Sequence, residues 1–240
     1  MNKKNILTLA IALFSLGLAS CAHYVPPSKH KAQYADQDPI EGLNRMVFSI
    51  NEAADTFLVR PVAVTYRDWA PTPVKNRVGD FLSHIKLPTT FINNAFQGEW
   101  DKFGENFGRF MVNTIIGLGG FIDVYPEKPK HVGFGDSLAH WGVGEGAYVV
   151  LPAFGPSNAR DTVGTVVDLV TNPLNWTLFH EFEVAATKSY VQAVHNRADT
   201  VKILDDIKKT SVDFYAKIRS ISRQQRYNEN YPEEKLSFNN

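Results

Sequence analysis

The stretch that decides the fold is residues 100–124, which read WDKFGENFGRFMVNTIIGLGGFIDV. Its first part carries large apolar side chains at three- and four-residue steps, and that spacing places them on one face of a helix. These side chains are Trp100, Phe103, Phe107, Phe110, Met111 and Ile115. Gly117, Gly119 and Gly120 then interrupt the pattern, because closely spaced glycines mark a turn. The sequence therefore predicts an amphipathic helix over 99–116 followed by a glycine turn.

Two interpretations of the apolar part of this stretch remain open. Between Phe110 and Val124 the only ionisable side chain is that of Asp123. The segment is too short to cross about 30 Å of hydrocarbon as one helix. It is either a buried helix with a turn or an apolar hairpin lying within a bilayer. Gly104 and Gly108, four residues apart, would let another helix approach closely in either setting.

Further helices are predicted on both sides. One begins at Asp38-Pro39, where an Asp before a Pro and a Glu three residues after the Asp form a helix-start signature, and its apolar stripe extends to Leu58. A second helix begins at Thr72, and a third begins at Pro88 and stops at Gly98. Another begins at Ser157, which is predicted to cap it, and ends at Pro173. Two more helices cover about 180–198 and 200–225. Residues 125–156 are rich in Gly and Pro, with a short extended stretch over 149–151. The expected fold is mostly α, with irregular Gly/Pro-rich loops.

The first residues have the pattern of an export signal. Lys3 and Lys4 precede an apolar run that ends at Leu18, and small residues follow up to Cys21. Cys21 is the only cysteine and stands where bacterial lipoproteins are acylated, so we predict that it carries lipid. Two or more acyl chains would anchor the protein stably. The alternative is an ordinary signal peptide with a chance cysteine.

These features predict the organisation of the whole chain. Residues 1–20 form the signal peptide, 21–37 a flexible tether, 38–226 a helical domain and 227–240 a disordered tail. In lipoproteins of this type, Ala22 directly after the cysteine implies sorting to the outer membrane.

Charge and cysteine content exclude several classes of function. The chain has 25 basic and 25 acidic residues, and loss of Lys3 and Lys4 with the signal leaves a formal charge of −2. Without a basic face the sequence predicts no nucleic-acid partner. One cysteine excludes an intrachain disulfide and a multi-thiolate zinc site.

The catalytic motifs are incomplete. Gly135-Asp136-Ser137-Leu138 spells a lipolytic-hydrolase signature, but no later Asp-x-x-His pair could activate the serine. We therefore predict that Ser137 is a turn residue, with an esterase as the alternative. Gly142-x-Gly144-x-x-Ala147 resembles a dinucleotide loop, but an extended stretch and Pro152 follow where a helix would have to begin. Ser83-x-x-Lys86 has the spacing of penicillin-binding proteins without their Ser-Asp-Asn, so we predict a solvated helix face. His180 and Glu183 could share a helix face, but no third metal ligand is evident. The sequence predicts no enzyme, no metal and no cofactor.

Several blocks, in order along the chain, carry a family resemblance. They contain Asp38, Pro39, Asn44 and Arg45; Arg60 and Pro61; residues 113–124; Gly142, Gly144 and Pro152; and Arg160 and Asp161. From about Asp38 to Tyr215 these blocks resemble the MlaA (VacJ) family of outer-membrane lipoproteins.

The resemblance implies both an architecture and a function. Family members are expected to form a ring of amphipathic helices embedded in the periplasmic leaflet of the outer membrane, around a central amphipathic channel. Through it they remove mislocalised phospholipids from the outer leaflet and hand them to a soluble periplasmic carrier, and they associate with trimeric porins. On this basis the glycine turn, with Gly117, Gly119 and Gly120, shapes the channel, and Asp123 faces its polar side. A passive scaffold that only holds a partner is the further alternative.

Overall fold

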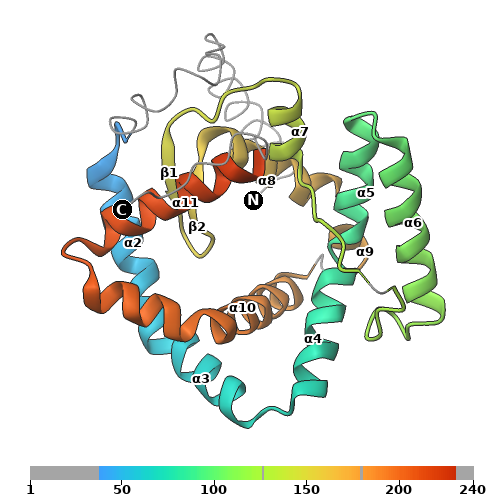
Figure 1. The fold of residues 1–240 in the computed structure, drawn as a ribbon, viewed down its shortest axis with the longest axis horizontal. Coiled ribbons are helices and arrows are strands. Elements are labelled where there is room, and N and C mark those ends of the chain that lie inside the picture. Colours follow the sequence, from blue (N-terminus) through green and yellow to red (C-terminus); the bar gives the residue numbers. More distant parts are fainter. Residues whose placement is uncertain (1–37, 126, 179–180, 231–240) are drawn as a thin grey trace. The chain divides into compact units, whose positions relative to one another are not determined.

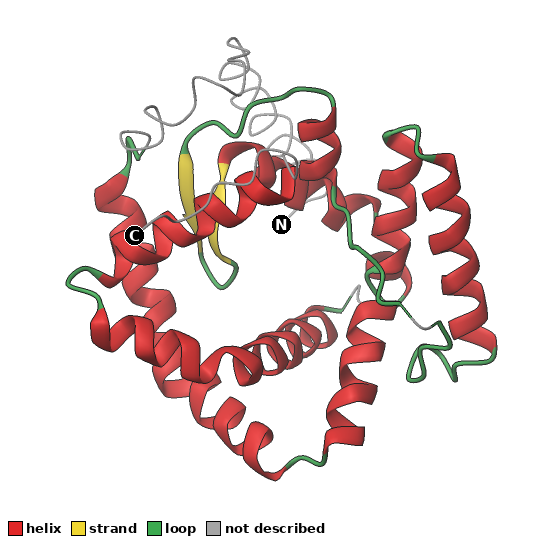
Figure 2. Ribbon diagram, in the orientation of Figure 1, coloured by secondary structure: helices red, strands yellow, loops and turns green. Residues whose placement is uncertain are grey.

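The computed structural model describes residues 38–125, 127–178 and 181–230, and its elements carry the labels of Figure 1. The predicted signal peptide, Cys21 and the tether lie outside these residues. The described chain is mostly helical, with one antiparallel pair of short strands (Figure 2). The prediction of a mostly α fold is confirmed.

Contacts group the chain into two compact units, each built from separated segments. Among the described residues, unit 1 combines residues 38–50 with Phe134–Val167 and with residues 215–230. Unit 2 combines Asn51–Gly133 with Asp168–Phe214. Three of the four boundaries fall inside helices, in α2, α8 and α11, so continuous helical backbone belongs to both units.

Unit 1 packs helices around the strand pair. Its elements are the start of α2 (Glu41–Ala54), α7 (Phe134–His140), β1 (Tyr148–Leu151), β2 (Gly155–Asn158), the start of α8 (Ala159–Thr171) and nearly all of α11 (Phe214–Asn230). β1 pairs with β2 so that Tyr148 lies opposite Asn158. Tyr148, Val150 and Tyr215 form the buried apolar centre, against which Val47 packs.

Unit 2 is all helical within the described residues. It holds η2 (Asp55–Val59), α3 (Arg60–Trp69), α4 (Thr72–His84), α5 (Leu87–Phe96), α6 (Trp100–Ile115), α9 (Pro173–Thr177) and α10 (Phe182–Thr210). α5 and α6 lie side by side (Figure 1), with Phe91 edge-on to Phe107 at 5.5 Å. α10 packs along α3 through a cluster of Ala63, Val194, Ala198 and Val201. Gly98, with a φ of 74°, ends the α5 segment as predicted.

A π-helical turn, η2, carries the chain from α2 into α3. Pro61 has no N–H to donate to the carbonyl of Phe57, so a regular α-helical bond is missing here. The N–H of Arg60 bonds instead to the carbonyl of Asp55, five residues earlier. The Tyr190 hydroxyl donates to the carbonyl of Leu58 at 3.0 Å. The wider turn keeps the helix continuous across the proline.

The predicted break near residue 199 is wrong. α10 runs unbroken from Phe182 to Thr210, and the chain leaves the helix only at 211–213. The physical reason is packing, because Val194, Ala198 and Val201 continue one buried stripe against α3 across the predicted break.

Two other boundaries also need correction. α11 continues beyond the predicted domain end at 226 to Asn230, because Tyr227 near its end is buried. The rest of the predicted tail, 231–240, lies outside the described residues. Ser157 does not cap α8: it belongs to β2, and the side chain of Asn158 accepts the N–H of Asp161 at 2.8 Å.

The pattern of burial is inverted relative to a water-soluble protein. Among the described residues, eleven hydrophobic residues are buried against thirteen polar or charged ones. Large apolar side chains are exposed along the predicted stripes, including Phe57 at 77 % and Ile115 at 71 %. Exposed apolar area on this scale marks an interaction surface.

These exposures decide part of the question left open for residues 110–124. The predicted helix and turn are confirmed, and the alternative of a buried apolar segment does not fit, because Ile115, Ile116, Leu118 and Phe121 are all exposed. Nor does another described helix approach the two small residues of α6: nothing lies within 4 Å of a Cβ built at Gly104, and only the Tyr125 hydroxyl approaches Gly108. No helix in the described part of the chain has the length and apolar character to cross a bilayer.

Candidate functional site

A buried ion pair holds the glycine turn that follows α6. Arg109 donates from Nη1 to Oδ2 of Asp123 at 3.2 Å, and their side chains are only 3 % and 8 % exposed. Asn113 donates to the other carboxylate oxygen at 2.9 Å and accepts the N–H of Val124 at 3.0 Å. Asp123 is thus engaged within the turn. Its position in a channel stays a prediction.

The three glycines of the turn are required for different reasons. A Cβ at Gly117 would overlap the carbonyl oxygens of Ile122 and Asn113. Gly120 has a φ of 92°, and a Cβ there would overlap the ring of His84. Gly119 has a φ of 72° but open space around it. The turn therefore fits closely at two positions and depends on backbone conformation at the third.

His84 links the turn to the helix before it. Its ring stacks on Phe110 with centroids 4.8 Å apart, and its Nε2 lies 3.3 Å from the Thr114 hydroxyl. Burial lowers the pKa of His84, with the opposing charge of Asp123 the smaller influence. The neutral ring therefore serves as packing for Gly120.

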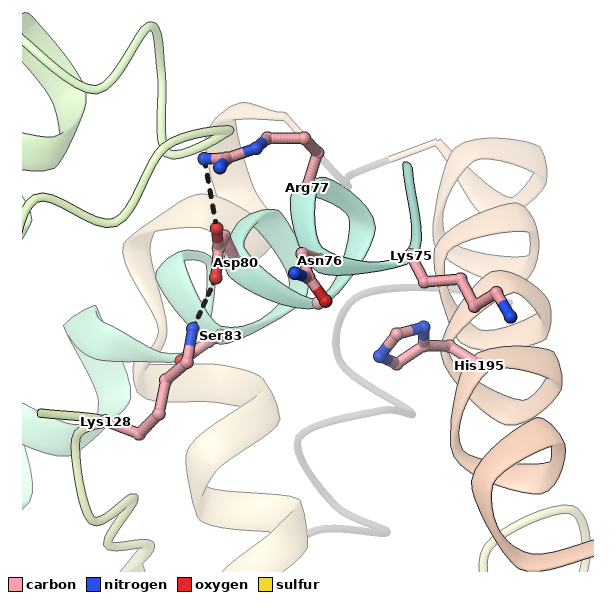
Figure 3. Close-up of a pocket in the computed structure, with 8 residues that line it drawn as sticks. Lys75, Asn76, Arg77, Asp80, Ser83, Lys128 and His195 are labelled. Carbon is pink, nitrogen blue, oxygen red and sulfur yellow. Dashed lines mark hydrogen bonds and ion pairs between the residues drawn. The ribbon is translucent and has the colours of Figure 1, made fainter. Parts of the chain in front are cut away.

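Beside the turn lies a polar pocket of about 400 Å³ (Figure 3). Its lining comes from α4, from the chain after the turn and from α10: Lys75, Asn76, Arg77, Gly79, Asp80, Ser83, Lys128 and His195. In Figure 3, Asp80 stands between Arg77 and Lys128, with Lys75 and His195 farther along. The wall therefore carries three cations and one carboxylate.

Fixed partners hold the charged groups of the pocket in place. Asp80 is buried, accepts from Arg77 at 3.3 Å and pairs with Lys128. Arg77 also donates to the carbonyl of Phe121 in the glycine turn, at 3.2 Å. Lys75 donates to the carbonyl of Arg67 at 2.6 Å. These bonds orient the cations before any ligand arrives.

A close helix contact forms the far side of the pocket. The ring of His195 on α10 lies near Gly79 on α4, where a Cβ would come within 3.1 Å of its Nε2. His195 Nδ1 lies 3.2 Å from the Tyr66 hydroxyl. A side chain at position 79 would press on this ring.

A second polar group joins Ser83 to buried residues behind the pocket. Ser83 Oγ lies 2.9 Å from Nε2 of His131, whose Nδ1 lies 3.1 Å from the Thr90 hydroxyl. The Thr90 hydroxyl donates its one proton to the carbonyl of Lys86, so it accepts from Nδ1 of His131. The neutral ring then has a free lone pair on Nε2, which accepts from the Ser83 hydroxyl. The order of atoms is that of a nucleophile, a base and an orienting group.

The chemistry of this group nevertheless argues for a structural role. Burial, with the charges of Lys86 and Arg109, lowers the pKa of His131 to about 4, and Thr90 has no charge to stabilise an imidazolium. A base so weak takes a proton poorly at neutral pH. The prediction that Ser83 and Lys86 form a solvated face is wrong, because both are half-buried.

Behind this group two lysines lie in each other's field. Burial lowers the pKa of Lys86, and the positive charge of Lys188 lowers it further. Burial also lowers the pKa of Lys188. Unit 2 thus contains cations that are partly withdrawn from water.

In unit 1 the motif residues near the start of α2 form a polar core. Asn44 is fully buried, donates to Asp38 at 2.7 Å and to the carbonyl of Tyr148 at 3.0 Å, and accepts the N–H of Val150. Burial by itself raises the pKa of Asp38, but hydrogen bonds from Tyr215, Arg219 and Asn44 hold it below its ordinary value. These bonds tie α2 and α11 to β1.

The neighbouring motif residues Pro39 and Arg45 lie at the edge of this core. Pro39 is exposed before α2. Arg45 pairs with Glu41 at 2.7 Å, and its guanidinium lies 4.4 Å from the ring centre of Tyr215.

A second motif core lies at the start of α8. The Arg160 side chain is buried, donating to Asp161 at 3.0 Å and to the carbonyl of Val143 at 3.2 Å. Asp161 also accepts from Arg226 on α11 at 2.7 Å. Burial alone would raise the pKa of Asp161, but the bonds and charges of Arg226 and Arg160 lower it.

The motif Gly and Pro residues of unit 1 lie in the loops on either side of β1. Gly142 has a φ of 83°, which favours glycine, while Gly144 has open space around it. Pro152 lies in the turn that joins β1 to β2. β1 follows Ala147, so no helix opens there as a dinucleotide loop would require.

The remaining motif pair organises unit 2. Pro61 stands at the start of α3, next to η2. Arg60 donates to both oxygens of Asp205, at 2.6 and 3.3 Å, and Arg197 bonds the same carboxylate. The hydrogen bond from Arg60, with support from Arg197, lowers the pKa of Asp205 to about 2.

Ser137 is not a turn residue. It lies within α7 and is fully buried, so the prediction of a turn is wrong. A buried hydroxyl cannot reach an acyl ester, which argues against the esterase alternative. In the described chain no three His, Cys, Asp or Glu side chains gather as metal ligands. His180 lies outside the described residues.

Comparison with known proteins identifies the family. A model described as MlaA lipoprotein matches residues 36–229. The chain belongs to the MlaA lipoprotein family. Its MlaA relatives include the intermembrane phospholipid transport system lipoprotein MlaA of Escherichia coli strain K12, 33 % identical over 217 residues, or 88 % of this chain and 83 % of that one.

Two further matches agree with this assignment to the MlaA family. An uncharacterized protein of Rickettsia bellii is 36 % identical over 193 residues, covering 79 % of this chain and 75 % of that one. A solved structure, described as the structural basis for maintenance of bacterial outer membrane lipid asymmetry, superposes with a TM-score of 0.69 at 33 % identity. It covers 80 % of this chain and 98 % of the other.

The MlaA motifs did not point to the cationic pocket. Lys75, Arg77 and Lys128 lie outside the short sequence blocks that carry the family resemblance, although the family model spans them. Arg77 and Asp80, three residues apart on one predicted helix, were the available signal. The approach of Lys128 and His195 to that helix is a tertiary contact that one sequence does not encode locally.

Proposed function

We propose that this protein is an outer-membrane lipoprotein that removes mislocalised phospholipids from the outer leaflet. It hands them to a soluble periplasmic carrier and so maintains lipid asymmetry. Support comes from membership of the MlaA family and from relatives named as intermembrane phospholipid transport lipoproteins. The observation that carries the proposal is the combination in unit 2 of outward-facing apolar helices with a cationic pocket.

The apolar surface fits a protein that lies in one leaflet. Amphipathic helices bury their apolar face at the boundary between headgroups and acyl chains, without crossing the bilayer. The outward side chains of α2, η2 and α6 supply such a face. Lipid on Cys21 would fix the protein at the periplasmic leaflet, since acyl chains add to the apolar area held by the membrane.

The transport path is a central amphipathic channel within a ring of helices. A phospholipid needs a polar route for its headgroup while its tails remain in apolar surroundings. The glycine turn with Gly117, Gly119 and Gly120 shapes the wall of this channel, and Asp123 stands on its polar side.

A trimeric porin and a soluble periplasmic carrier are the protein partners that we propose. A porin would hold the protein beside the outer leaflet, and a carrier would remove lipid from the periplasmic side. Crosslinking at Phe57 and Trp100, two exposed apolar positions, would test for a porin contact.

Deleting the gene and measuring phospholipid in the outer leaflet tests the transport function. We expect more surface phospholipid and greater sensitivity to detergent, both restored by the wild-type protein. Cys21→Ala should lose its acyl mass and leave the membrane fraction, whereas Ser20→Ala should keep both. Unchanged surface phospholipid in the deletion strain would remove the proposed function. Normal transport by a folded Gly120→Val protein would instead favour a passive scaffold.

A further inference from the structure

We propose that the pocket lined by Lys75, Arg77 and Lys128 binds the phosphate of a lipid headgroup and prefers headgroups with a net negative charge. A glycerol phosphodiester would bind more tightly than a zwitterionic ethanolamine phosphodiester. This inference rests on the proposed function and adds a headgroup preference to it.

The charge of the lining sets the preference. Three cations and the single carboxylate of Asp80 leave an excess of two positive charges. Arg77 and Lys128 both engage that carboxylate, so it has little capacity left for another cation. A phosphate gains from the excess positive charge, whereas the ammonium of an ethanolamine group is repelled by it.

The geometry is prepared for an anion. Bonds to the carbonyl oxygens of Arg67 and Phe121 hold the Lys75 ammonium and the Arg77 guanidinium at the wall. Fixed donors lose less conformational entropy when a ligand binds. Asn76 adds an amide donor for the ester oxygens or the glycerol hydroxyls. The volume of about 400 Å³ is within the range of small-molecule sites.

Exposed apolar residues lie next in the chain to the residues that hold the cations of the pocket. Val74 precedes Lys75 and is exposed, and Phe121, whose carbonyl binds Arg77, is exposed as well. Trp69 on α3 is exposed close in sequence to Arg67, the partner of Lys75. Exposed apolar residues so near the cations in sequence favour a lipid over a soluble anion, because acyl chains would cover apolar surface.

Binding to the purified, full-length mature lipoprotein tests this inference. The probes are dihexanoyl phosphatidylglycerol, dihexanoyl phosphatidylethanolamine and inorganic phosphate, with calorimetry and the NMR signals of His195 as readouts. We expect the glycerol lipid to bind about fivefold to tenfold more tightly than the ethanolamine lipid and to shift the His195 signals.

The variant Lys75→Gln/Lys128→Gln should weaken binding of the glycerol lipid about tenfold, or about 1.4 kcal/mol, because it removes two partly exposed ionic contacts to the phosphate. It should change binding of the ethanolamine lipid less than threefold. Lys102→Gln removes the charge of a lysine that pairs with Glu99 on α6 and does not line the pocket. It should leave both affinities unchanged.

Each contrary result has a distinct meaning. Equal affinity for the two lipids, or equal losses in the pocket and Lys102 variants, overturns the inference. Inorganic phosphate that binds as tightly as the glycerol lipid would identify a free-ion site and also overturn it. If the binding test fails but the wild-type protein still restores normal surface phospholipid in a deletion strain, only the headgroup preference is overturned and the transport function is not. Failure of that restoration would remove the function itself.

Discussion

Adding a methyl group at Gly120 should loosen the glycine turn, and the neighbouring glycine provides a matched control. Gly119 and Gly120 both have positive φ, at 72° and 92°. They differ in surroundings, because a Cβ at 119 meets open space and a Cβ at 120 overlaps the ring of His84. Alanine at either position must adopt a positive φ, which is unfavourable for a residue with a Cβ. Only alanine at position 120 also requires the ring of His84 to move.

The structure gives a separate magnitude for each cost. A non-glycine residue in the left-handed region loses about 1–2 kcal/mol. Displacing a packed ring costs about 1–3 kcal/mol more. His84 has little freedom to yield, because it stacks on Phe110. We expect Gly119→Ala to lower the free energy of unfolding by about 1–2 kcal/mol and Gly120→Ala by about 2–5 kcal/mol.

Thermal and urea unfolding of the purified variants measure this difference. At about 2–4 °C per kcal/mol, Gly120→Ala should melt clearly below Gly119→Ala. In a protein that already carries His84→Ala, the ring is gone, and Gly120→Ala should be less destabilising. The loss of the double variant should fall short of the sum of the two single losses by about 1–3 kcal/mol. Equal losses at the two glycines, or additive losses in the double variant, would refute the steric reasoning.

The other predictions concern buried polar groups. Arg109→Ala should lower the free energy of unfolding by about 3–5 kcal/mol, because it takes the buried guanidinium away from the Asp123 carboxylate and leaves it with Asn113 and, at 4.0 Å, the exposed Lys128; a loss below 1 kcal/mol would contradict a buried pair. Burial lowers the pKa of His131 to about 4 in the folded protein, whereas in the unfolded chain its pKa is about 6.5. The unfolded chain therefore binds a proton more readily, and protonation favours unfolding as the pH falls below about 6.5. Stability should drop by about 2 kcal/mol between pH 7 and pH 5, and His131→Gln should remove that part of the slope. Asn44→Ala should cost about 2–4 kcal/mol in urea unfolding, because it leaves the N–H of Val150 without its buried partner; a loss below 1 kcal/mol would contradict that role.

Periodicity predicted the helices well where the chain also carries a local stop signal. Pro73 near the start of α4 and Gly98 after α5 mark boundaries that the structure confirms. Near residue 199 no such signal exists, and the continuity of α10 depends on Ala63 of α3 packing against Val194 and Ala198. The predicted break was wrong because the buried stripe of α10 packs on α3 and continues even where the local periodicity weakens.

Direction of burial could not be predicted from periodicity. An amphipathic pattern defines two faces of a helix, but it does not say whether the apolar face meets a core or a membrane. The face of α6 has Phe107 packed on Phe91 and Ile115 exposed, so one stripe serves both purposes. The candidate pocket escaped prediction for a related reason: Lys128 and Asp80 are far apart in the chain and meet only after folding.

The inverted burial requires a source of stability other than an apolar core. Helices whose apolar faces meet lipid gain little from the hydrophobic effect when they associate, so interhelical hydrogen bonds and close packing must hold them. Seven of the thirteen buried polar residues in the described chain are asparagines. Asn106 on α6 donates to Asn94 on α5 at 3.0 Å, and Asn93 donates to Asp168 at 2.9 Å. An amide can donate and accept at once without a charge to desolvate, so it suits such contacts in water and in lipid. A protein with its apolar residues outward and its asparagines inward is organised for a solvent that is partly a membrane.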